Sequence, residues 1–308
     1  MVQRMKAAGG ILIGKTNAPE FGPGFHTCNR VFGSTRNAFD PRFTAGGSSG
    51  GAAVALAFRM LPVADGSDMM GSLRNPAGFN NVFGLRPSLG RVPAWPKLEV
   101  WVSQLGTEGP IGRTVQDVAH LLAIQAGHDG RAPSAIVGRW SHMGLNIPLD
   151  LRQVRIGWLG DLEGYLAMEP GLLPVCSAAL QHLAEDGCTL KPAQAAFTLA
   201  EVWQTWLRWR RWLVAANLRE FWDDPLQRVE PKASAQCEAE QGEMVSARDV
   251  TGRPSHAADT TSRYRVCFSA STTWPCPPRR SGHLRRHWIG QCPLPGATWT
   301  PTTAGWMS

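Results

Sequence analysis

Long apolar runs are missing from this sequence, although 43% of its 308 residues are hydrophobic. A helix that spans a membrane needs about 20 consecutive, mainly apolar residues, and the longest candidate, Ala52–Met60, is interrupted by Arg59. No apolar core follows Met1–Met5 either, so the sequence predicts no signal peptide. These absences argue against a membrane partner and favour a globular chain of one large or two ordinary domains.

Paired cysteine spacing is missing as well. The cysteines are odd in number, and no two of them have the short spacing that is typical of a zinc site. We therefore expect neither a disulfide framework nor a bound metal, and a reducing, cytoplasmic location. The seven positions are Cys28, Cys176, Cys188, Cys237, Cys267, Cys276 and Cys292.

Acidic residues become scarce only near the end of the chain. Residues 251–308 contain seven arginines, one aspartate and no lysine or glutamate, so they carry +6 of the net charge of +7. The rest of the chain is almost neutral. Because binding to nucleic acid needs a basic patch on the folded body, we expect no nucleic-acid partner.

The stretch Thr44–Ser88 holds two serines that are enclosed by glycines. Ser48 lies in Gly46–Gly51 (GGSSGG), and Ser72 ends the run Gly66–Ser72 (GSDMMGS). Glycines beside a serine allow a sharp turn, close approach of a ligand and inward-pointing N–H groups. An exposed hydroxyl next to such donors suits acyl transfer through a covalent intermediate.

Other functions of glycine-rich loops fit this stretch less well. The pattern Gly46-x-Ser48-x-Gly50 matches the nucleophile elbow of α/β-hydrolases, but that elbow follows a buried strand, whereas Phe39–Arg42 is turn-like. A phosphate-binding loop needs a lysine after its glycines, and none follows here. A purely structural glycine turn does not predict the second serine loop downstream.

The order of these motifs resembles that of the amidase signature family of amide hydrolases. The resemblance rests on GGSSGG, on GSDMMGSLRNPA and on GLRPSLGRV, with Ser48 and Ser72 at the family's interval. It implies an α/β fold with a mixed central sheet flanked by helices, incomplete at both ends of this chain. Residues 1–250 would then be a partial amidase signature domain.

The resemblance also implies roles for individual residues. Ser72 becomes the acyl-accepting nucleophile, and Ser48, which follows a cis peptide in the family, becomes its proton shuttle. Ser49 and Asp68 become supporting residues, and neither a metal nor a cofactor takes part. The side chain of Met70 departs from the family, which has a glycine there, and crowds the oxyanion turn. The N–H groups that would form the oxyanion hole are those of Met69, Met70, Gly71 and Ser72.

The lysine that completes the family's triad lies upstream of the residues present here. Lys15 is the one tempting substitute, but its setting, Ile13–Asn17 (IGKTN), matches a different segment of the family. We therefore expect this chain to lack the base that serves Ser48, and to be inactive by itself.

Periodicity and capping signals predict the helices and strands of the body. Thr114 and Asp117 resemble a capping box for a helix that runs to Ala126. Other helices are expected at Met1–Ala8, Asn17–Glu20, Ala52–Met60, Pro174–Asp186 and Ala200–Trp222. Strands are expected at Ile11–Ile13, Leu61–Ala64, Asn80–Arg91 and Val154–Trp158, and from Cys188 onward.

The helix predicted at Ala200–Trp222 contains five tryptophans with arginines between them. Aromatic and basic residues in alternation occur on surfaces that bind nucleic acid or membranes. The spacing here, however, gives one apolar and one basic face. We interpret the segment as a helix that packs on the body or lines a hydrophobic substrate pocket.

The composition changes abruptly near Val250. Residues 251–308 contain nine threonines and seven prolines and show no helical or strand period. Read one base out of register, Thr298–Ser308 can encode M-D-T-Y-H-R-W-M-D-E, which resembles a downstream segment of the family. We therefore expect residues 251–308 to be an out-of-frame, disordered tail.

Together these features predict an amidase-type hydrolase that cleaves a carbon–nitrogen bond in a small-molecule amide, and they are compatible with a homodimer. Two alternatives remain open. One is an amidotransferase A-type subunit that supplies ammonia for charged transfer RNA. The other is a catalytically dead remnant or binding protein, which the missing lysine favours.

Overall fold

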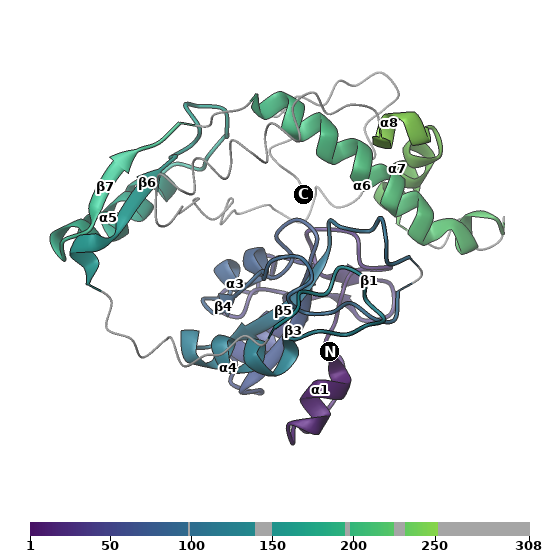
Figure 1. Cartoon of the computed structure of the whole chain (residues 1–308), viewed down its shortest axis with the longest axis horizontal. Helices are drawn as coiled ribbons and strands as arrows, with labels where there is room; N and C mark the ends of the chain where they lie inside the picture. Colours follow the sequence, from purple (N-terminus) through teal and green to yellow (C-terminus); the bar gives the residue numbers. More distant parts are fainter. Residues whose placement is uncertain (98, 139–149, 195–197, 225–231, 252–308) are drawn as a thin grey trace.

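The structure, a computed structural model, has a central body to which a βαβ unit and a group of helices are attached (Figure 1). The expected tail, except for Thr251, lies outside the residues that the structure describes. Those residues are 1–97, 99–138, 150–194, 198–224 and 232–251.

A three-stranded antiparallel sheet forms the centre of the body. Its strands are β3 (Val63–Asp68), β5 (Thr107–Gly112) and β4 (Phe83–Gly84), in the order β3-β5-β4. Asp68, the last residue of β3, is paired with Thr107, the first residue of β5. The segment that joins β3 to the next helix contains Ser72. It therefore begins at one end of this sheet.

Helices α2 (Gly50–Ala57), α3 (Arg74–Phe79) and α4 (Val115–Gln125) pack on the central sheet. Since α2 begins directly after Ser49 and α3 directly after Leu73, the packing of the core fixes both serine loops at their ends. The buried side chains of this core are Ala52, Leu56, Leu73 and Ile111.

The capping box predicted for α4 is confirmed. The amide of Asp117 donates to Thr114 Oγ1 over 3.0 Å, and the amide of Thr114 donates to Asp117 Oδ2 over 3.1 Å. The predicted first helix is also present as α1 (Val2–Ala7). Arg4 connects the two helices, because its guanidinium binds the carbonyl oxygens of Ala126 and His128 just beyond the end of α4.

Two predictions for the N-terminal segment are wrong. Ile11–Ile13 forms no strand, and its side chains are exposed, with Ile11 88% exposed. An apolar run becomes a buried strand only when a neighbouring strand pairs with it, and no described strand does so here. Asn17–Glu20 forms no helix; the Asn17 side chain instead donates to Thr35 Oγ1 over 2.9 Å.

The chain after this segment makes a small hairpin and then a shortened strand. β1 (Cys28–Asn29) and β2 (Gly33–Ser34) pair antiparallel. The strand expected within Asn80–Arg91 is limited to the two residues of β4.

The strands and helix predicted between residues 151 and 192 are confirmed, and they form a βαβ unit. Strands β6 (Arg155–Trp158) and β7 (Thr189–Pro192) are parallel, and α5 (Leu172–Glu185) connects them. A short 3-10 helix, Leu151–Gln153, precedes β6. The core of the unit contains Val154, Ile156, Leu180 and Cys188.

The tryptophan-rich helix is confirmed as α6 (Leu199–Trp222), and it packs on α7 (Ala233–Glu243), which the sequence did not predict. Arg210 and Glu238 join them through two hydrogen bonds of 2.9 Å each, and α8 (Ala247–Thr251) also contacts α6. The interpretation of α6 as a packing helix holds for its inner face. The buried residues between α6 and α7 are Val214, Leu218, Ala235 and Ala239.

The α/β class is confirmed, and the strands of the described residues belong to three sheets, two antiparallel and one parallel. Among the described helices none is long and apolar enough to cross a membrane. Cys28, Cys176 and Cys188 are free, but Cys237 is disulfide-bonded. The sequence predicted no disulfide framework, and it did not indicate this single bond because sequence spacing does not report which cysteines meet in the fold.

Ile111→Ala is expected to lower the free energy of unfolding by about 2–5 kcal/mol, because it leaves a cavity among fully buried neighbours. Ile11→Ala removes the same atoms from an exposed side chain and should change the free energy by less than about 0.5 kcal/mol. Equilibrium urea denaturation measures both values. Equal losses would show that Ile11 is buried after all.

Candidate active site

The Ser48 turn (Gly46–Ser49) connects an extended segment to α2. The peptide bond between Gly47 and Ser48 is cis, as the resemblance implied. Gly46 has a φ of +74°, which favours glycine, and a Cβ on it would lie 3.2 Å from Pro76 Cα in α3. Backbone conformation and the close contact with α3 therefore both favour glycine at position 46.

The side chain of Thr27 binds the backbone of the Ser48 turn. This residue is 1% exposed, and its Oγ1 lies 2.9 Å from the carbonyl oxygen of Gly46 and 3.2 Å from that of Ser48. The same hydroxyl accepts the N–H of Gly50 over 3.0 Å, and a Cβ on Gly50 would collide with it. One buried hydroxyl thus fixes the backbone on both sides of Ser48, a role that no motif in the sequence indicated.

The Ser72 loop (Met69–Ser72) connects β3 to α3. The carboxylate of Asp68 turns back into the loop and accepts the N–H of Gly71 over 2.6 Å and that of Leu73 over 3.2 Å. These bonds give the loop its tight curvature, because one carboxylate satisfies donors three and five residues further along the chain.

Two guanidinium groups surround the Asp68 carboxylate, which is 0% exposed. Arg74 Nε lies 3.0 Å from Oδ2, and Arg86 Nη1 lies 2.9 Å from Oδ1. Burial alone would raise the pKa of Asp68, but the bonds from Arg74, Gly71 and Arg86 outweigh it and lower the pKa to about 2. Asp68 is therefore ionised at neutral pH.

Arg86 also links Asp68 to a more distant segment. Besides the carboxylate, its guanidinium binds the carbonyl oxygen of Asp68 and, over 2.9 Å, that of Leu105 just before β5. Arg74 and Arg86 were both present in the motifs GSLR and GLRPS, and an aspartate expected at the site needs cationic partners if it is buried. The sequence contained this signal, but nothing in it placed the three side chains together.

The two serine loops meet through their backbones. The amide of Ser49 donates to the carbonyl oxygen of Ser72 over 3.2 Å, and Ser49 Oγ lies 3.5 Å from the carbonyl oxygen of Ser67. A Cβ on Gly66 would collide with Ser49 Oγ, so this glycine gives Ser49 its space. The structure thus brings Ser48, Ser49 and Ser72 to one place, where Ser48 and Ser72 are half-buried.

The amides expected to form an oxyanion hole are not equivalent. Gly71 donates its N–H to Asp68, so it is not free in this structure. In the described residues no acceptor binds the amides of Met69, Met70 and Ser72. The Asp68 carboxylate therefore orients the loop through Gly71 and leaves its neighbours as the available donors.

No lysine reaches the serines in the part of the chain that the structure describes. Lys15 is exposed, and within this part no hydrogen bond joins it to Ser48. Its neighbours nevertheless lie close to the site, because a Cβ on Gly51 would be 2.6 Å from the amide nitrogen of Asn17.

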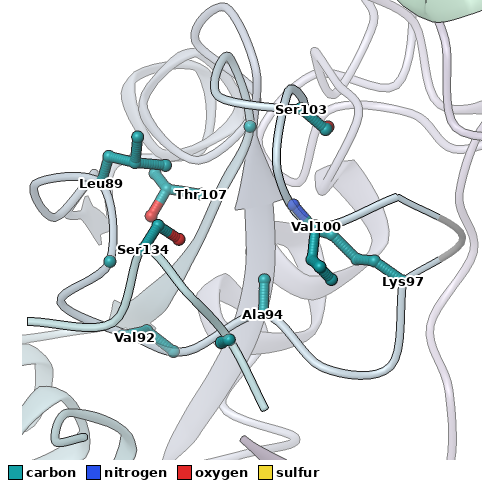
Figure 2. A pocket seen from close by; sticks show the side chains of 11 residues that line it. Leu89, Val92, Ala94, Lys97, Val100, Ser103, Thr107 and Ser134 are labelled. Atoms are coloured by element: carbon teal, nitrogen blue, oxygen red, sulfur yellow. The ribbon is translucent and has the colours of Figure 1, made fainter. Parts of the chain in front are cut away.

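A small pocket elsewhere in the body is separate from the serine loops (Figure 2). Its free volume of about 10 Å³ is that of roughly one water molecule. Thr107, at the start of β5, belongs to its lining, but none of the predicted site residues does. The lining also includes Leu89, Val92, Lys97, Val100, Ser103 and Ser134. Among the described residues there is no cluster of three or more His, Cys, Asp or Glu side chains suited to a metal ion.

Comparison with known proteins connects this geometry to a family. Residues 1–265 match the model of the family described as Amidase. The chain belongs to the amidase family. Its α/β fold and its recognition as an amidase signature protein are both confirmed by this match and by the solved structures that resemble it.

The curated relatives of this amidase family member include A-type subunits of glutamyl-tRNA(Gln) amidotransferases. The one from Thermosynechococcus vestitus is 38% identical over 190 residues, and the one from Sulfurisphaera tokodaii is 35% identical over 193 residues. Each match covers 62% of this chain and 39% of the relative. The chain thus spans about two fifths of the length of these relatives.

Solved structures of the amidase family resemble a larger part of the chain. A bacterial aryl acylamidase of the amidase signature enzymes gives a TM-score of 0.80 over 91% of this chain and 60% of that chain, at 24% identity. 6-Aminohexanoate cyclic dimer hydrolase gives 0.79 over 88% and 57%, at 26% identity. The A-type subunit of the Thermotoga maritima glutamyl-tRNA(Gln) amidotransferase gives 0.59 over 87% and 53%, at 25% identity.

Asp68→Asn is expected to lower the free energy of unfolding at pH 7 by about 2 kcal/mol, the value of a pKa shift of almost two units. Since the folded-state pKa lies below the ordinary value of 3.8, the ionised carboxylate stabilises the fold above about pH 4. This contribution is lost as the pH falls towards 2. Denaturation of both proteins between pH 7 and pH 2 should therefore show a gap that closes only in acid.

Asp186→Asn, at the exposed end of α5, is the matched control and should change stability by less than about 0.5 kcal/mol. A gap for Asp68→Asn that stays constant from pH 7 to pH 2 would contradict the depressed pKa.

Proposed function

We propose that this protein hydrolyses a carbon–nitrogen bond of a small-molecule amide through an acyl-enzyme on Ser72. The observation that carries the proposal is the 3.2 Å hydrogen bond from the Ser49 amide to the Ser72 carbonyl oxygen. It sets the Ser48 turn against the Ser72 loop, and both serines are half-buried, which supports a shared site. Membership of the amidase family supports the same chemistry.

In the proposed reaction, Ser72 Oγ attacks the carbonyl carbon of the amide, and its proton passes to Ser48. The carbonyl oxygen becomes an oxyanion that accepts hydrogen bonds from amides of the Ser72 loop, for which Met69, Met70 and Ser72 are the available donors. Collapse of this intermediate breaks the carbon–nitrogen bond, and the leaving amine takes up the proton. Water then hydrolyses the ester on Ser72 and releases the acid. No metal or cofactor is needed for any of these steps.

The proton relay needs a base for Ser48, and we propose that residues 1–308 alone react slowly because no described lysine supplies it. In serine hydrolases, loss of a base still leaves the modest catalysis that the oxyanion donors and substrate binding provide. A catalytically dead remnant or binding protein is the limiting case of this expectation.

A second candidate function is that of an amidotransferase A-type subunit, which the 38% identity to such a subunit of a glutamyl-tRNA(Gln) amidotransferase favours. This function needs partner subunits, whereas an independent amidase works by itself or as a homodimer. Affinity purification from the native cell separates the two functions, because only an amidotransferase A-type subunit is expected to co-purify with the other subunits of an amidotransferase. We propose no nucleic-acid or membrane partner and a cytoplasmic location. The free thiols of Cys28, Cys176 and Cys188 support this location, whereas the disulfide-bonded Cys237 argues against it.

Labelling with a fluorophosphonate, which reacts covalently with activated serines, tests the nucleophile. We expect slow labelling that peptide mass spectrometry assigns to Ser72, complete loss of labelling in Ser72→Ala, and a rate at least about tenfold lower in Ser48→Ala because the proton relay is broken. Ser177→Ala, on the exposed face of α5, should leave the rate unchanged. Labelling at another serine would contradict the proposal.

Turnover of simple aryl amides tests the missing base. We expect rates several orders of magnitude below those of a complete serine hydrolase, and Lys15→Met should not change them because Lys15 is exposed and does not contact Ser48. Fast turnover that both Ser72→Ala and Lys15→Met abolish would identify Lys15 as the base and overturn this expectation.

A further inference from the structure

The Ser48 turn rests on the loop Pro23–Thr27 at two points besides the Thr27 hydroxyl. A Cβ on Gly47 would lie 2.7 Å from the carbonyl oxygen of Phe25, so the two backbones are in direct contact. His26 Nδ1 lies 2.9 Å from Thr44 Oγ1, and the same hydroxyl accepts the Gly46 amide over 3.1 Å. Any shift of the loop therefore reaches the turn on both sides of Ser48.

The loop in turn is held by the hairpin of α6 and α7. Lys232, the residue that caps the N-terminus of α7, donates a hydrogen bond from Nζ to the carbonyl oxygen of Pro23. Gly24 leaves the space for it, since a Cβ at that position would collide with Nζ. Phe221 of α6 packs edge-on against Phe21 at 4.6 Å between ring centres. The hairpin thus contacts the first residue of the loop through Lys232 and the segment just before the loop through Phe221.

The side chain of Lys232 is partly buried. Burial lowers the pKa of its ammonium, and Glu238 and Glu20 act against that change. Burial lowers the pKa of His26 as well, with a smaller contribution from Lys232. The lowered pKa favours the neutral form of His26, which contacts Thr44 Oγ1.

We propose that Lys232 is a positioning residue for the reaction at Ser72: it fixes the loop Pro23–Thr27, and through that loop the Ser48 turn. Neither Lys232 nor His26 touches the reacting atoms. The role rests on the proposed function, because it matters for catalysis only if Ser48 passes protons to and from Ser72. Its structural part, the coupling of the hairpin to the turn, holds independently of any reaction.

Lys232→Met, which keeps an apolar stem as far as the Cε position and removes the donor, tests the proposal in the full chain by amide hydrogen exchange. We expect exchange in residues 44–51 to become about tenfold faster, the consequence of losing a hydrogen bond to a charged group, while α4 stays protected. The maximal rate of Ser72 labelling should fall by a similar factor at unchanged apparent affinity for the fluorophosphonate. Lys232→Arg, which retains a cationic donor, should restore both.

Lys191→Met, at an exposed lysine of β7, is the matched control and should change neither readout. Exchange in residues 44–51 within twofold of wild type in Lys232→Met would overturn the proposal. If that variant loses protection in α4 as well, Lys232→Gln replaces it. The glutamine amide is shorter and uncharged, so it weakens the bond to Pro23 without removing the donor. Faster exchange confined to residues 44–51 then supports the proposal, and wild-type exchange in these residues overturns it. A wild-type protein that is not labelled would count against the proposed function alone, since exchange does not depend on Ser72.

Discussion

The fully buried carboxylate of Asp68 is the group on which the arrangement of the body depends. An isolated charge in such a position is strongly unfavourable, and here two arginines and two backbone amides compensate for it. Those four donors come from the Ser72 loop, from α3 and from the segment after β4. The requirement to satisfy one charge therefore fixes three parts of the chain relative to the end of β3. The curvature of the Ser72 loop follows from this requirement together with the positive φ of Gly71, a conformation that favours glycine.

The Ser48 turn is held by a different kind of interaction. Its support is a single uncharged hydroxyl, that of Thr27, together with close backbone contacts that only glycine permits. One serine loop is thus organised by charge and the other by steric fit, and a single backbone hydrogen bond from Ser49 joins them. The difference matters for function because the two loops respond to different conditions: acid weakens the first, whereas displacement of the loop Pro23–Thr27 disturbs the second.

Local signals in the sequence were sufficient where the structure is local. The capping box of Thr114 and Asp117 is a pattern of four residues, and it predicted the start of α4 correctly. The serine motifs predicted two loops, and the structure joins these loops through the bond from the Ser49 amide to the Ser72 carbonyl oxygen. Strand β5 was missed because Gly109, Pro110 and Gly112 disfavour a strand, and only pairing with β3 and β4 overrides that preference. Ile11–Ile13 failed for the opposite reason, because its favourable composition meets no partner strand in the described residues. Contacts such as that of Thr27 with Ser48, or of Arg86 with Asp68, join segments whose proximity no single stretch of sequence reveals.

The bond between Lys232 and Pro23 has a consequence for the order of events during synthesis. It joins residues 209 positions apart in the chain, so the body of residues 1–138 leaves the ribosome long before its last support exists. Contacts of such long sequence separation form late in folding. A nascent chain therefore carries both serine loops before Lys232 has been synthesised. At that stage Asp68 can already pair with Arg74 and Arg86, but the bond from Lys232 to Pro23 is still absent. The support of the Ser48 turn by Lys232 is completed only after α6 and the start of α7 have been synthesised.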